Sequence, residues 1–338
     1  WTQHRQHPQR QPILTRLTTD SGLSTDPALS PDGKLLAFAS DRGAPSGPGG
    51  SLDIWVRQMA GGEPIRLTTD PADDREPSFS PDGSQIAFRS ERNPAGIYVI
   101  SALGGGEPRL LAAGGHNPRY SPGGKWVAYW TGELTAFSHV YLVAATGGAP
   151  KRLEFRPALQ AARCPTWAPD GKRLLILGGS LPAGRFDWWV ASVESGEVVQ
   201  TGAFEVLRRH RIPVSQFLEP SQWQEQGILF SATAEGSTAP WRIPIGRDSR
   251  ITAPPVRLTF GTGLDTRPSA ASDGRVAFAS LAENIDVWSL PIDANQAKTR
   301  GELQRLTQDA AADLHPSVSA DGKQMVIRSN RSGAWDVW

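Results

Sequence analysis

The fold of this chain is decided by the stretch Pro27-Ala28-Leu29-Ser30-Pro31-Asp32-Gly33 and the apolar run that follows it, Leu35-Leu36-Ala37-Phe38-Ala39-Ser40. Pro31 fixes φ at the first central position of a turn, Asp32 suits the second, and Gly33 closes the turn. The stretch therefore predicts a short strand, a tight turn and a second, more apolar strand.

The same pattern recurs along the chain at intervals of 41 to 55 residues. Its leading prolines are Pro27, Pro77, Pro118, Pro165, Pro220, Pro268 and Pro316. In the first copy an aromatic third strand follows, Asp53-Ile54-Trp55-Val56, and then a short outer strand, Ile65-Arg66-Leu67-Thr68. A period of about 40–50 residues with four strands in each copy is typical of the blades of a β-propeller.

Seven copies predict an all-β fold, a seven-bladed β-propeller over residues 13–338, with residues 1–12 as a linker. The last copy stops at Trp338 without an outer strand, whereas residues 13–18 match the outer strands of other copies. We expect residues 13–18 to pair with the strand that ends at Trp338, because this would close the ring and remove an exposed edge. The irregular fifth copy leaves a six-bladed ring as the alternative.

Composition excludes several classes of protein. The formal net charge of +1 disfavours a nucleic-acid surface, which needs a basic excess. No apolar run approaches the roughly 18 residues of a membrane-spanning helix, so direct membrane insertion is not expected. The single cysteine, Cys164, rules out a disulfide framework. A chain that begins at Trp1 indicates a piece of a larger protein.

The repeat resembles the TolB-type propeller repeat, a WD-like unit. The resemblance is carried by Leu17-Thr18 through Val56, Leu67-Thr68 through Ile100, and Leu258-Thr259 through Trp338. It implies a non-catalytic sensor or scaffold domain of a larger bacterial protein, located in the periplasm or otherwise outside the cytoplasm; the residues themselves leave a cytoplasmic location open. It also implies a binding surface at the mouth of the central channel, which in the family receives a peptide segment of a partner protein.

The residue before each leading proline enters the innermost strand and is predicted to line this channel mouth. These residues are Asp26, Glu76, Asn117, Cys164, Glu219, Arg267 and His315. Three arginines lie next to them in the sequence, Arg75, Arg119 and Arg163. Arginine offers a planar fork of donors that suits carboxylates. The set predicts a mixed-charge site for a peptide or a small polar ligand, although polar residues are also tolerated in a wet channel without any ligand.

The motifs of the common enzyme classes are missing from the sequence. There is no Gly-x-Ser-x-Gly elbow, no zincin motif and no glycine loop before a helix, so no enzyme, cofactor or metal site is predicted. Acidic groups such as Asp70, Asp73 and Asp74, or Asp309 and Asp313, lack EF-hand spacing and are predicted to be solvated loop caps. Two alternatives stay open: the accessory propeller of a peptidase whose catalytic domain is absent, and a metal-dependent propeller enzyme.

Tryptophan recurs at one position of the aromatic strand, as Trp55, Trp189 and Trp288. Recurrence at one position of a stacked repeat is how packing residues behave. We therefore predict that these three side chains are buried.

Overall fold

The structure is a computed structural model, and it describes residues 13–20, 22–43, 50–133, 137–180, 185–234, 236–261, 263–281, 285–293, 295–308, 312–329, 331–332 and 335–338. The predicted linker, residues 1–12, lies outside these ranges. The chain divides into two compact units, Trp1–Ser280 and Leu281–Trp338, which are treated separately below. A single domain over residues 13–338 stays a prediction.

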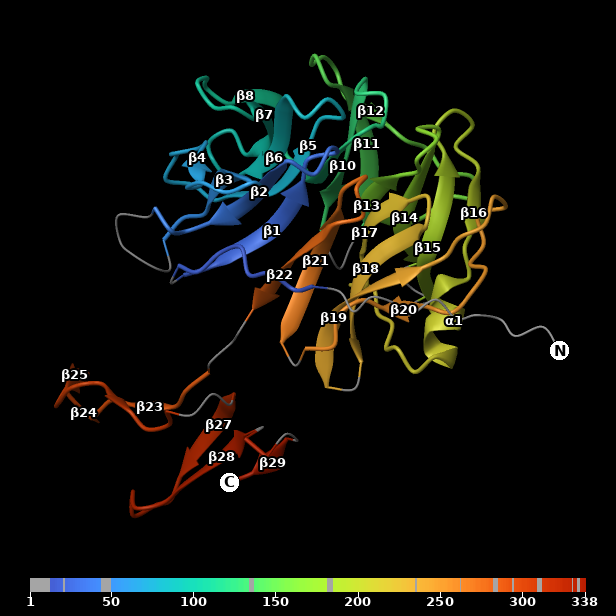
Figure 1. Ribbon diagram of the computed structural model, residues 1–338. Coiled ribbons are helices and arrows are strands. Elements are labelled where there is room, and N and C mark those ends of the chain that lie inside the picture. The colour runs from blue at the N-terminus through green and yellow to red at the C-terminus, as the bar shows by residue number, and fades with distance from the viewer. Residues whose placement is uncertain are drawn as a thin grey trace. The chain divides into compact units, whose positions relative to one another are not determined.

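The first unit is a succession of antiparallel sets of strands, called sheets below, that follow one another in chain order (Figure 1). Single parallel bridges, Ser138 with Ala161 and Thr238 with Leu264, join the third set to the fourth and the fifth set to the sixth. Each sheet begins with its innermost strand and ends with a short outer strand. The strands of the first three sheets are β1 (Ser24–Leu29), β2 (Leu35–Ser40), β3 (Asp53–Gln58) and β4 (Ile65–Arg66); β5 (Asp74–Phe79), β6 (Gln85–Ser90), β7 (Gly96–Ser101) and β8 (Arg109–Ala113); β9 (His116–Tyr120), β10 (Trp126–Gly132), β11 (Ser138–Ala144) and β12 (Lys151–Arg152).

Three further sets of strands complete the unit. They are β13 (Ala161–Trp167), β14 (Arg173–Ser180), β15 (Arg185–Ser192) and β16 (Val198–Gln200); β17 (Pro220–Gln224), β18 (Gly227–Ala234), β19 (Ser237–Ile243) and β20 (Val256–Arg257); and the pair β21 (Leu264–Ala270) and β22 (Val276–Leu281). The four-stranded repeat predicted from the sequence is thus present five times, followed by the first two strands of a sixth copy.

The innermost strands contact one another in sequence order, β1 with β5, then β9, β13, β17 and β21, and β21 in turn contacts β1. The apolar core lies between neighbouring sheets. One apolar cluster joins the first sheet to the last pair of strands, through Leu29, Leu36 and Phe38 on one side and Ala271 and Ala277 on the other. The first and sixth copies of the repeat are therefore packed together, as adjacent sheets elsewhere in the unit are.

The second unit contains β23 (Trp288–Ser289), β24 (Ile292–Asp293), β25 (Lys298–Thr299), β26 (Gln304–Arg305), β27 (Asp313–Val318), β28 (Met325–Ser329) and β29 (Asp336–Val337). β27, β28 and β29 form one antiparallel sheet, and β23 pairs with β26. Trp338 exchanges backbone hydrogen bonds with Ile327 at 2.8 and 2.9 Å. Residues 13–18 are not in a strand, so their pairing with the strand at Trp338 stays a prediction.

The turn chemistry predicted for the repeat is present. In the first copy the Gly33 N–H donates to the Ser30 carbonyl at 2.8 Å, and the Ser30 hydroxyl donates to Asp32 at 2.7 Å. Gly33 has φ of 70°, a conformation that glycine adopts with little strain. The turn therefore sets the register of β1 against β2.

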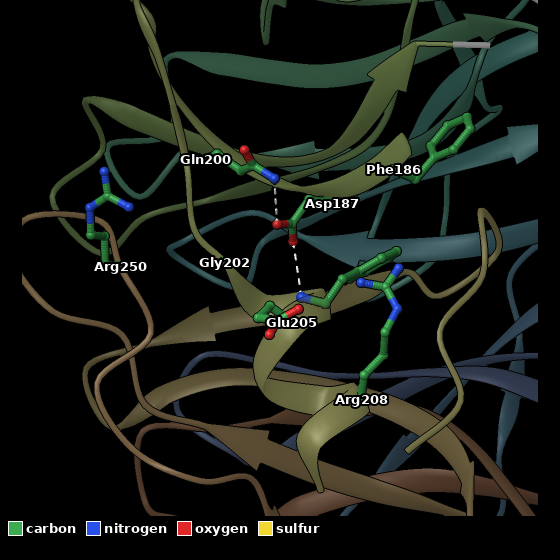
Figure 2. A pocket seen from close by; sticks show the side chains of 8 residues that line it. Phe186, Asp187, Gln200, Gly202, Glu205, Arg208 and Arg250 are labelled. Atoms are coloured by element: carbon green, nitrogen blue, oxygen red, sulfur yellow. Dashed lines mark hydrogen bonds between the residues drawn. The ribbon is translucent and has the colours of Figure 1, made fainter. Parts of the chain in front are cut away.

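One short helix, α1 (Ala203–Arg209), interrupts the connection between the fourth and fifth sheets and is the only α-helix among the described residues. Its Phe204 packs edge-on against Trp188, at 6.3 Å between ring centroids. The Phe204 N–H donates to the Asp187 carboxylate at 3.1 Å (Figure 2). The helix is thus attached to β15 by an aromatic contact and by a hydrogen bond at its first turn.

The recurring tryptophans are less buried than predicted. Trp55 and Trp189 are half-buried, and their indole N–H groups donate to the carbonyls of Ser40 and Gly178 on the second strands of their sheets. The prediction for Trp288 is wrong, because its side chain is 52 % exposed. The described strand β23 pairs only with the short β26, so no second strand covers this indole.

Candidate functional site

The residues predicted to line the channel mouth share an unusual backbone conformation. Six of the seven have φ between 52° and 59°: Asp26, Glu76, Asn117, Cys164, Arg267 and His315. Non-glycine residues seldom adopt this left-handed region, and each instance costs of order 1 kcal/mol or more. Glu219 is the exception, in the copy that carries one extra residue. A strained conformation repeated at one position of the fold indicates a shared structural role.

That role is a β-bulge, which the strand register shows in β1, β5, β9, β13 and β27. In the first sheet the pairing skips from Thr25 to Ala28, so Asp26 and Pro27 together lie opposite the single residue Phe38. The same shift occurs in the second, third and fourth sheets and in β27. A bulge of this kind redirects a side chain out of the normal alternation of the sheet. The sequence signal for the bulge was the proline that follows each of these residues, because proline has no N–H to donate to the backbone hydrogen bonds between strands.

The redirected side chains connect one innermost strand to the next. Arg267 Nε lies 2.9 Å from Asp26 Oδ1, which joins β21 to β1. The Glu76 N–H donates to Asp26 Oδ2 at 3.4 Å, and the Asn117 N–H donates to Glu76 Oε2 at 2.6 Å. Four consecutive innermost strands are therefore linked through these residues. We refer to Asp26, Glu76, Asn117, Cys164, Glu219 and Arg267 as the inner-strand cluster.

Cys164 and Glu219 form the other side of this cluster. The Cys164 side chain is buried, and burial raises the pKa of its thiol well above the usual range. The negative charge of the Glu219 carboxylate, to which the thiol is hydrogen-bonded, raises this pKa further. The thiol is therefore protonated at neutral pH and lacks the thiolate that a cysteine nucleophile requires.

The guanidinium groups of Arg267 and Arg119 offset part of the charge of the three carboxylates of the cluster. The Asp26 carboxylate raises the pKa of Arg267, and the Glu219 and Glu76 carboxylates act in the same direction. Burial lowers the pKa of Arg119, while the Glu76 carboxylate opposes that effect. The side chain of Arg267 is 46 % exposed, so its donors remain accessible to a ligand. The cluster offers both acceptors and donors in a small area.

The remaining predicted site residues lie apart from this cluster or have structural partners. Arg75 forms an ion pair with Asp73 at 2.8 Å, and both line a separate cavity of about 740 Å³ between the first and second sheets. Arg163 is buried and donates to the Gln216 carbonyl at 2.6 Å. His315 belongs to the second unit. Arg119 interacts electrostatically with Glu76 of the inner-strand cluster, and Arg163 interacts with Cys164.

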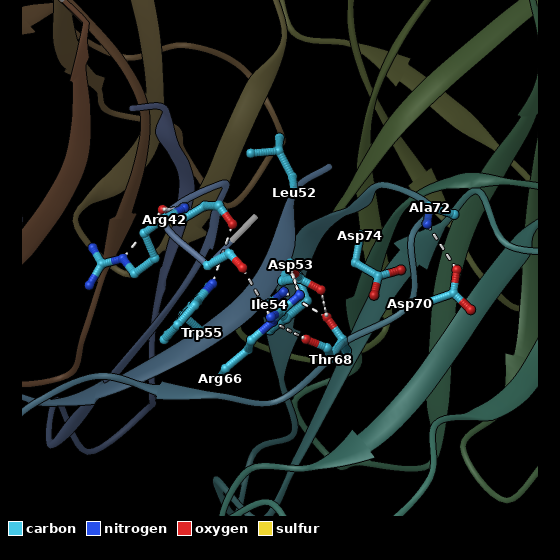
Figure 3. Close-up of polar contacts among 12 residues, drawn as sticks. Arg42, Leu52, Asp53, Ile54, Trp55, Arg66, Thr68, Asp70, Ala72 and Asp74 are labelled. Carbon is cyan, nitrogen blue, oxygen red and sulfur yellow. Dashed lines mark hydrogen bonds and ion pairs between the residues drawn. The ribbon is translucent and has the colours of Figure 1, made fainter. Parts of the chain in front are cut away.

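A second arrangement was missed by sequence reasoning: an ion pair between an Asp of the aromatic strand and an Arg of the outer strand, present in the first sheet and, as Asp286 with Arg305, in the second unit. In the first sheet Arg66 pairs with the buried Asp53 at 2.6 Å, and the Thr68 hydroxyl accepts from the Ile54 N–H at 2.9 Å (Figure 3). The sequence signal was the Asp of the aromatic strand combined with Arg-Leu-Thr in the outer strand. Because the Asp53 side chain has no exposed surface, this pair is structural.

Acidic residues near the strand ends also have structural partners. Asp74 is buried and pairs with Arg92 at 2.7 Å, and Asp313 pairs with Arg331 at 3.1 Å in the second unit. The prediction that these two are solvated loop caps is wrong, because their side chains are fully covered. Asp70 accepts from the Ala72 N–H, and Asp309 lies outside the described residues.

Comparison with known proteins identifies the fold. The structure is similar to TolB from Acinetobacter baumannii, with a TM-score of 0.58 and 20 % sequence identity over 74 % of this chain and 58 % of that one. It is similar to a putative TolB from Agrobacterium tumefaciens, with a TM-score of 0.54 and 19 % identity over 78 % of this chain and 92 % of that one. A Pyrococcus horikoshii acylaminoacyl peptidase aligns with a TM-score of 0.49 and 11 % identity, over 90 % of this chain and 57 % of the peptidase.

No protein-family model and no curated protein matches the sequence. The structural similarities define an all-β chain with a TolB-type propeller domain. The resemblance inferred from the repeat is thereby confirmed at the level of the fold.

Two kinds of feature are absent from the part of the chain that the structure describes. No group of three or more His, Cys, Asp or Glu side chains is placed to hold a metal ion in that part of the chain. None of the helices described there combines the length and the apolar character that crossing a bilayer requires.

Proposed function

We propose that this chain is a non-catalytic binding module that receives a peptide or a small polar ligand at the inner-strand cluster. The observation that carries the proposal is the chain of contacts Arg267–Asp26–Glu76–Asn117, formed by residues of four consecutive innermost strands. Packing alone does not require the charged residues Asp26, Glu76 and Arg267 at strained backbone positions. Binding sites are commonly built where a rigid scaffold presents convergent polar groups.

The chemistry of the cluster suits a ligand with both donors and acceptors. The carboxylates of Asp26, Glu76 and Glu219 accept hydrogen bonds, whereas the guanidiniums of Arg119 and Arg267 donate them. An extended peptide offers backbone N–H and C=O groups in alternation, and its side chains or termini add charge. A strongly charged ligand of one sign would meet repulsion from part of the cluster.

The proposal includes a six-bladed arrangement for the first unit. The contact of β21 with β1, the Arg267–Asp26 ion pair and the apolar cluster between Leu29 and Ala271 support it over the seven-bladed prediction. In this arrangement the six residues of the cluster come one from each blade, and His315 is not a member. The protonated Cys164 thiol supports a non-catalytic role.

We further propose that the module acts as the sensor or interaction domain of a larger bacterial protein outside the cytoplasm. This rests on the likeness of its fold to TolB and not on any single residue. The partner is therefore sought among peptides, not among nucleic acids or lipids.

Peptides selected from a display library against the whole chain test the proposed function. We expect Glu76→Gln and Arg267→Gln each to weaken binding of a selected peptide about tenfold, which is the effect of losing about 1.4 kcal/mol of charge interaction. Glu76→Gln keeps an acceptor for the Asn117 N–H and so isolates the charge. Affinities are measured by calorimetry.

The matched control is Arg152→Gln, which removes an exposed charge from the outer strand β12. Arg66 is unsuitable as a control, because its replacement would leave the buried carboxylate of Asp53 without its ion-pair partner. If Arg152→Gln abolishes binding while both cluster variants bind like the wild type, the ligand binds to the side of the sheets and the proposal fails.

A further inference from the structure

An exposed phenylalanine lies next to the inner-strand cluster. Phe217 is 52 % exposed and precedes Glu219 by two residues, in the connection that leads from α1 to the innermost strand β17. Single exposed apolar residues are common on protein surfaces and by themselves indicate no function. Phe217 differs from such residues in the way its backbone is held, in its departure from the repeat and in its neighbour Glu219.

The turn that carries Phe217 is held by two buried side chains of the fourth sheet. The guanidinium of Arg163 donates to the Gln216 carbonyl at 2.6 Å. The indole N–H of Trp188 donates to the Leu218 carbonyl at 2.8 Å. The residues on both sides of Phe217 are therefore anchored to the interior of the first unit.

Hydrogen bonds within the turn hold Phe217 itself. Its N–H donates to the Ser215 hydroxyl, and the Leu218 N–H donates to the Ser215 carbonyl, both at 3.1 Å. The Leu218 side chain is buried in the apolar core between the fourth and fifth sheets. The backbone of Phe217 is thus positioned before any ligand arrives, which lowers the entropy cost of binding.

Packing of the repeat does not require a large apolar residue at this position. The pairing of β17 with β18 begins at Pro220, so Phe217 lies outside the sheet. Glu219 also lacks the left-handed backbone conformation of its counterparts in the other copies. In the other five copies of the first unit the residue two before the cluster position is small or acidic: Ser24, Asp74, Gly115, Ala162 and Asp265.

Glu219 connects the turn to the inner-strand cluster. Its carboxylate is hydrogen-bonded to the Cys164 thiol of β13, and its charge raises the pKa of Arg267 in β21. Two residues of chain span at most about 7 Å. A peptide that contacts the Glu219 carboxylate therefore has Phe217 within reach of one of its own side chains.

We infer that Phe217 determines the specificity of the binding site: it contacts an aromatic or large aliphatic side chain of a bound peptide, while the polar groups of the inner-strand cluster hold the peptide backbone. The inference rests on the proposed function and narrows its ligand to a peptide with an apolar residue, because a small polar ligand leaves Phe217 without a contact. Aromatic pairs contribute binding energy beyond the apolar area that they bury.

A double-mutant cycle between the chain and a peptide tests the inference. Peptides selected from a display library against the whole chain are expected to share an aromatic or large aliphatic residue. One such peptide is made in two forms, with this residue and with alanine in its place. Phe217→Ala is expected to weaken binding of the selected peptide about tenfold and to leave the affinity of the alanine form unchanged. Affinities are measured by calorimetry.

The matched control is Phe260→Ala, which removes the same side chain from another place on the surface. Phe260 is 80 % exposed and lies beside Arg257 of the outer strand β20, at 5.7 Å between the guanidinium carbon and the ring centroid. This variant is expected to bind both forms of the peptide with wild-type affinity. Thermal melts that match the wild type show that each variant is folded.

The outcomes separate this inference from the proposed function. The inference is overturned if Phe217→Ala weakens both forms of the peptide equally or neither of them, or if Phe260→Ala has the same effect as Phe217→Ala. If Glu76→Gln and Arg267→Gln weaken binding and Phe217→Ala does not, the inference fails while the proposed function stands. If Phe217→Ala alone weakens binding, or if no peptide can be selected, the proposed function fails and the inference fails with it.

Discussion

Replacing Trp188 by alanine is expected to destabilise the first unit by about 3–5 kcal/mol, the range for truncating a large aromatic side chain in a core. Trp188 has no exposed surface and lies at 5.1 Å from the ring of Phe230 and 6.3 Å from that of Phe204. Its indole N–H donates to the buried Leu218 carbonyl at 2.8 Å. Truncation therefore leaves both a cavity and an unpaired carbonyl.

Urea unfolding followed by tryptophan fluorescence and circular dichroism measures this effect. Trp188→Phe keeps most of the packing but loses the hydrogen bond, so an intermediate loss is expected. Trp288→Ala is the control, because that side chain is 52 % exposed, and it is expected to cost less than about 1 kcal/mol. A Trp188→Ala variant as stable as the wild type would show that the junction between the fourth and fifth sheets does not depend on this residue.

Replacing Arg92 by alanine is expected to cost a similar amount, about 3–5 kcal/mol at neutral pH. The change leaves the carboxylate of Asp74 buried without its ion-pair partner, 2.7 Å away in the wild type. It also removes a hydrogen bond from Arg92 Nε to the Ser90 hydroxyl at 2.7 Å. Arg75→Ala, which breaks the exposed pair with Asp73, is the control and is expected to cost less than about 1 kcal/mol.

The cost of Arg92→Ala depends on pH in a direction that follows from Asp74. Burial raises the pKa of Asp74 to about 6, above its value in the unfolded chain, while Arg92 opposes the rise. The folded state therefore holds the proton more tightly, and this group's contribution to stability is lost as pH rises from about 4 through 6. Without Arg92 the pKa rises further, so the deficit of the variant is expected to be larger at pH 8 than at pH 5. A deficit that shrinks with rising pH contradicts this explanation.

The repeat made the sheets predictable, because each piece of its sequence has a local cause. The turn at Ser30 and Gly33 and the alternation of strands depend on residues close together in the chain, and the structure has them as predicted. The positions of Asp26 and Glu76 in the innermost strands were predicted in the same way, from the proline that follows each of them. Because the copies of the repeat share these residues, the strands and turn predicted for one copy could also be predicted for the next.

Features that depend on partners distant in the chain could not be predicted. Asp26 and Arg267 were both predicted to line the channel mouth, but their ion pair depends on the contact of β21 with β1, which the seven-bladed prediction did not include. The burial of Asp74 was missed because its partner, Arg92, lies across the sheet. From the sequence alone, an acidic residue in a solvated loop cannot be distinguished from one in a buried ion pair.

The central claim is that a ligand binds at the inner-strand cluster, and hydrogen exchange of the chain with and without a selected peptide tests it most directly. The account predicts slower exchange on binding in the innermost strands, above all at Glu76 and Asn117 in β5 and β9 and in β21 next to Arg267. The outer strands β4, β12 and β20 are expected to exchange at unchanged rates. Protection confined to those outer strands, with the innermost strands unaffected, would contradict the account.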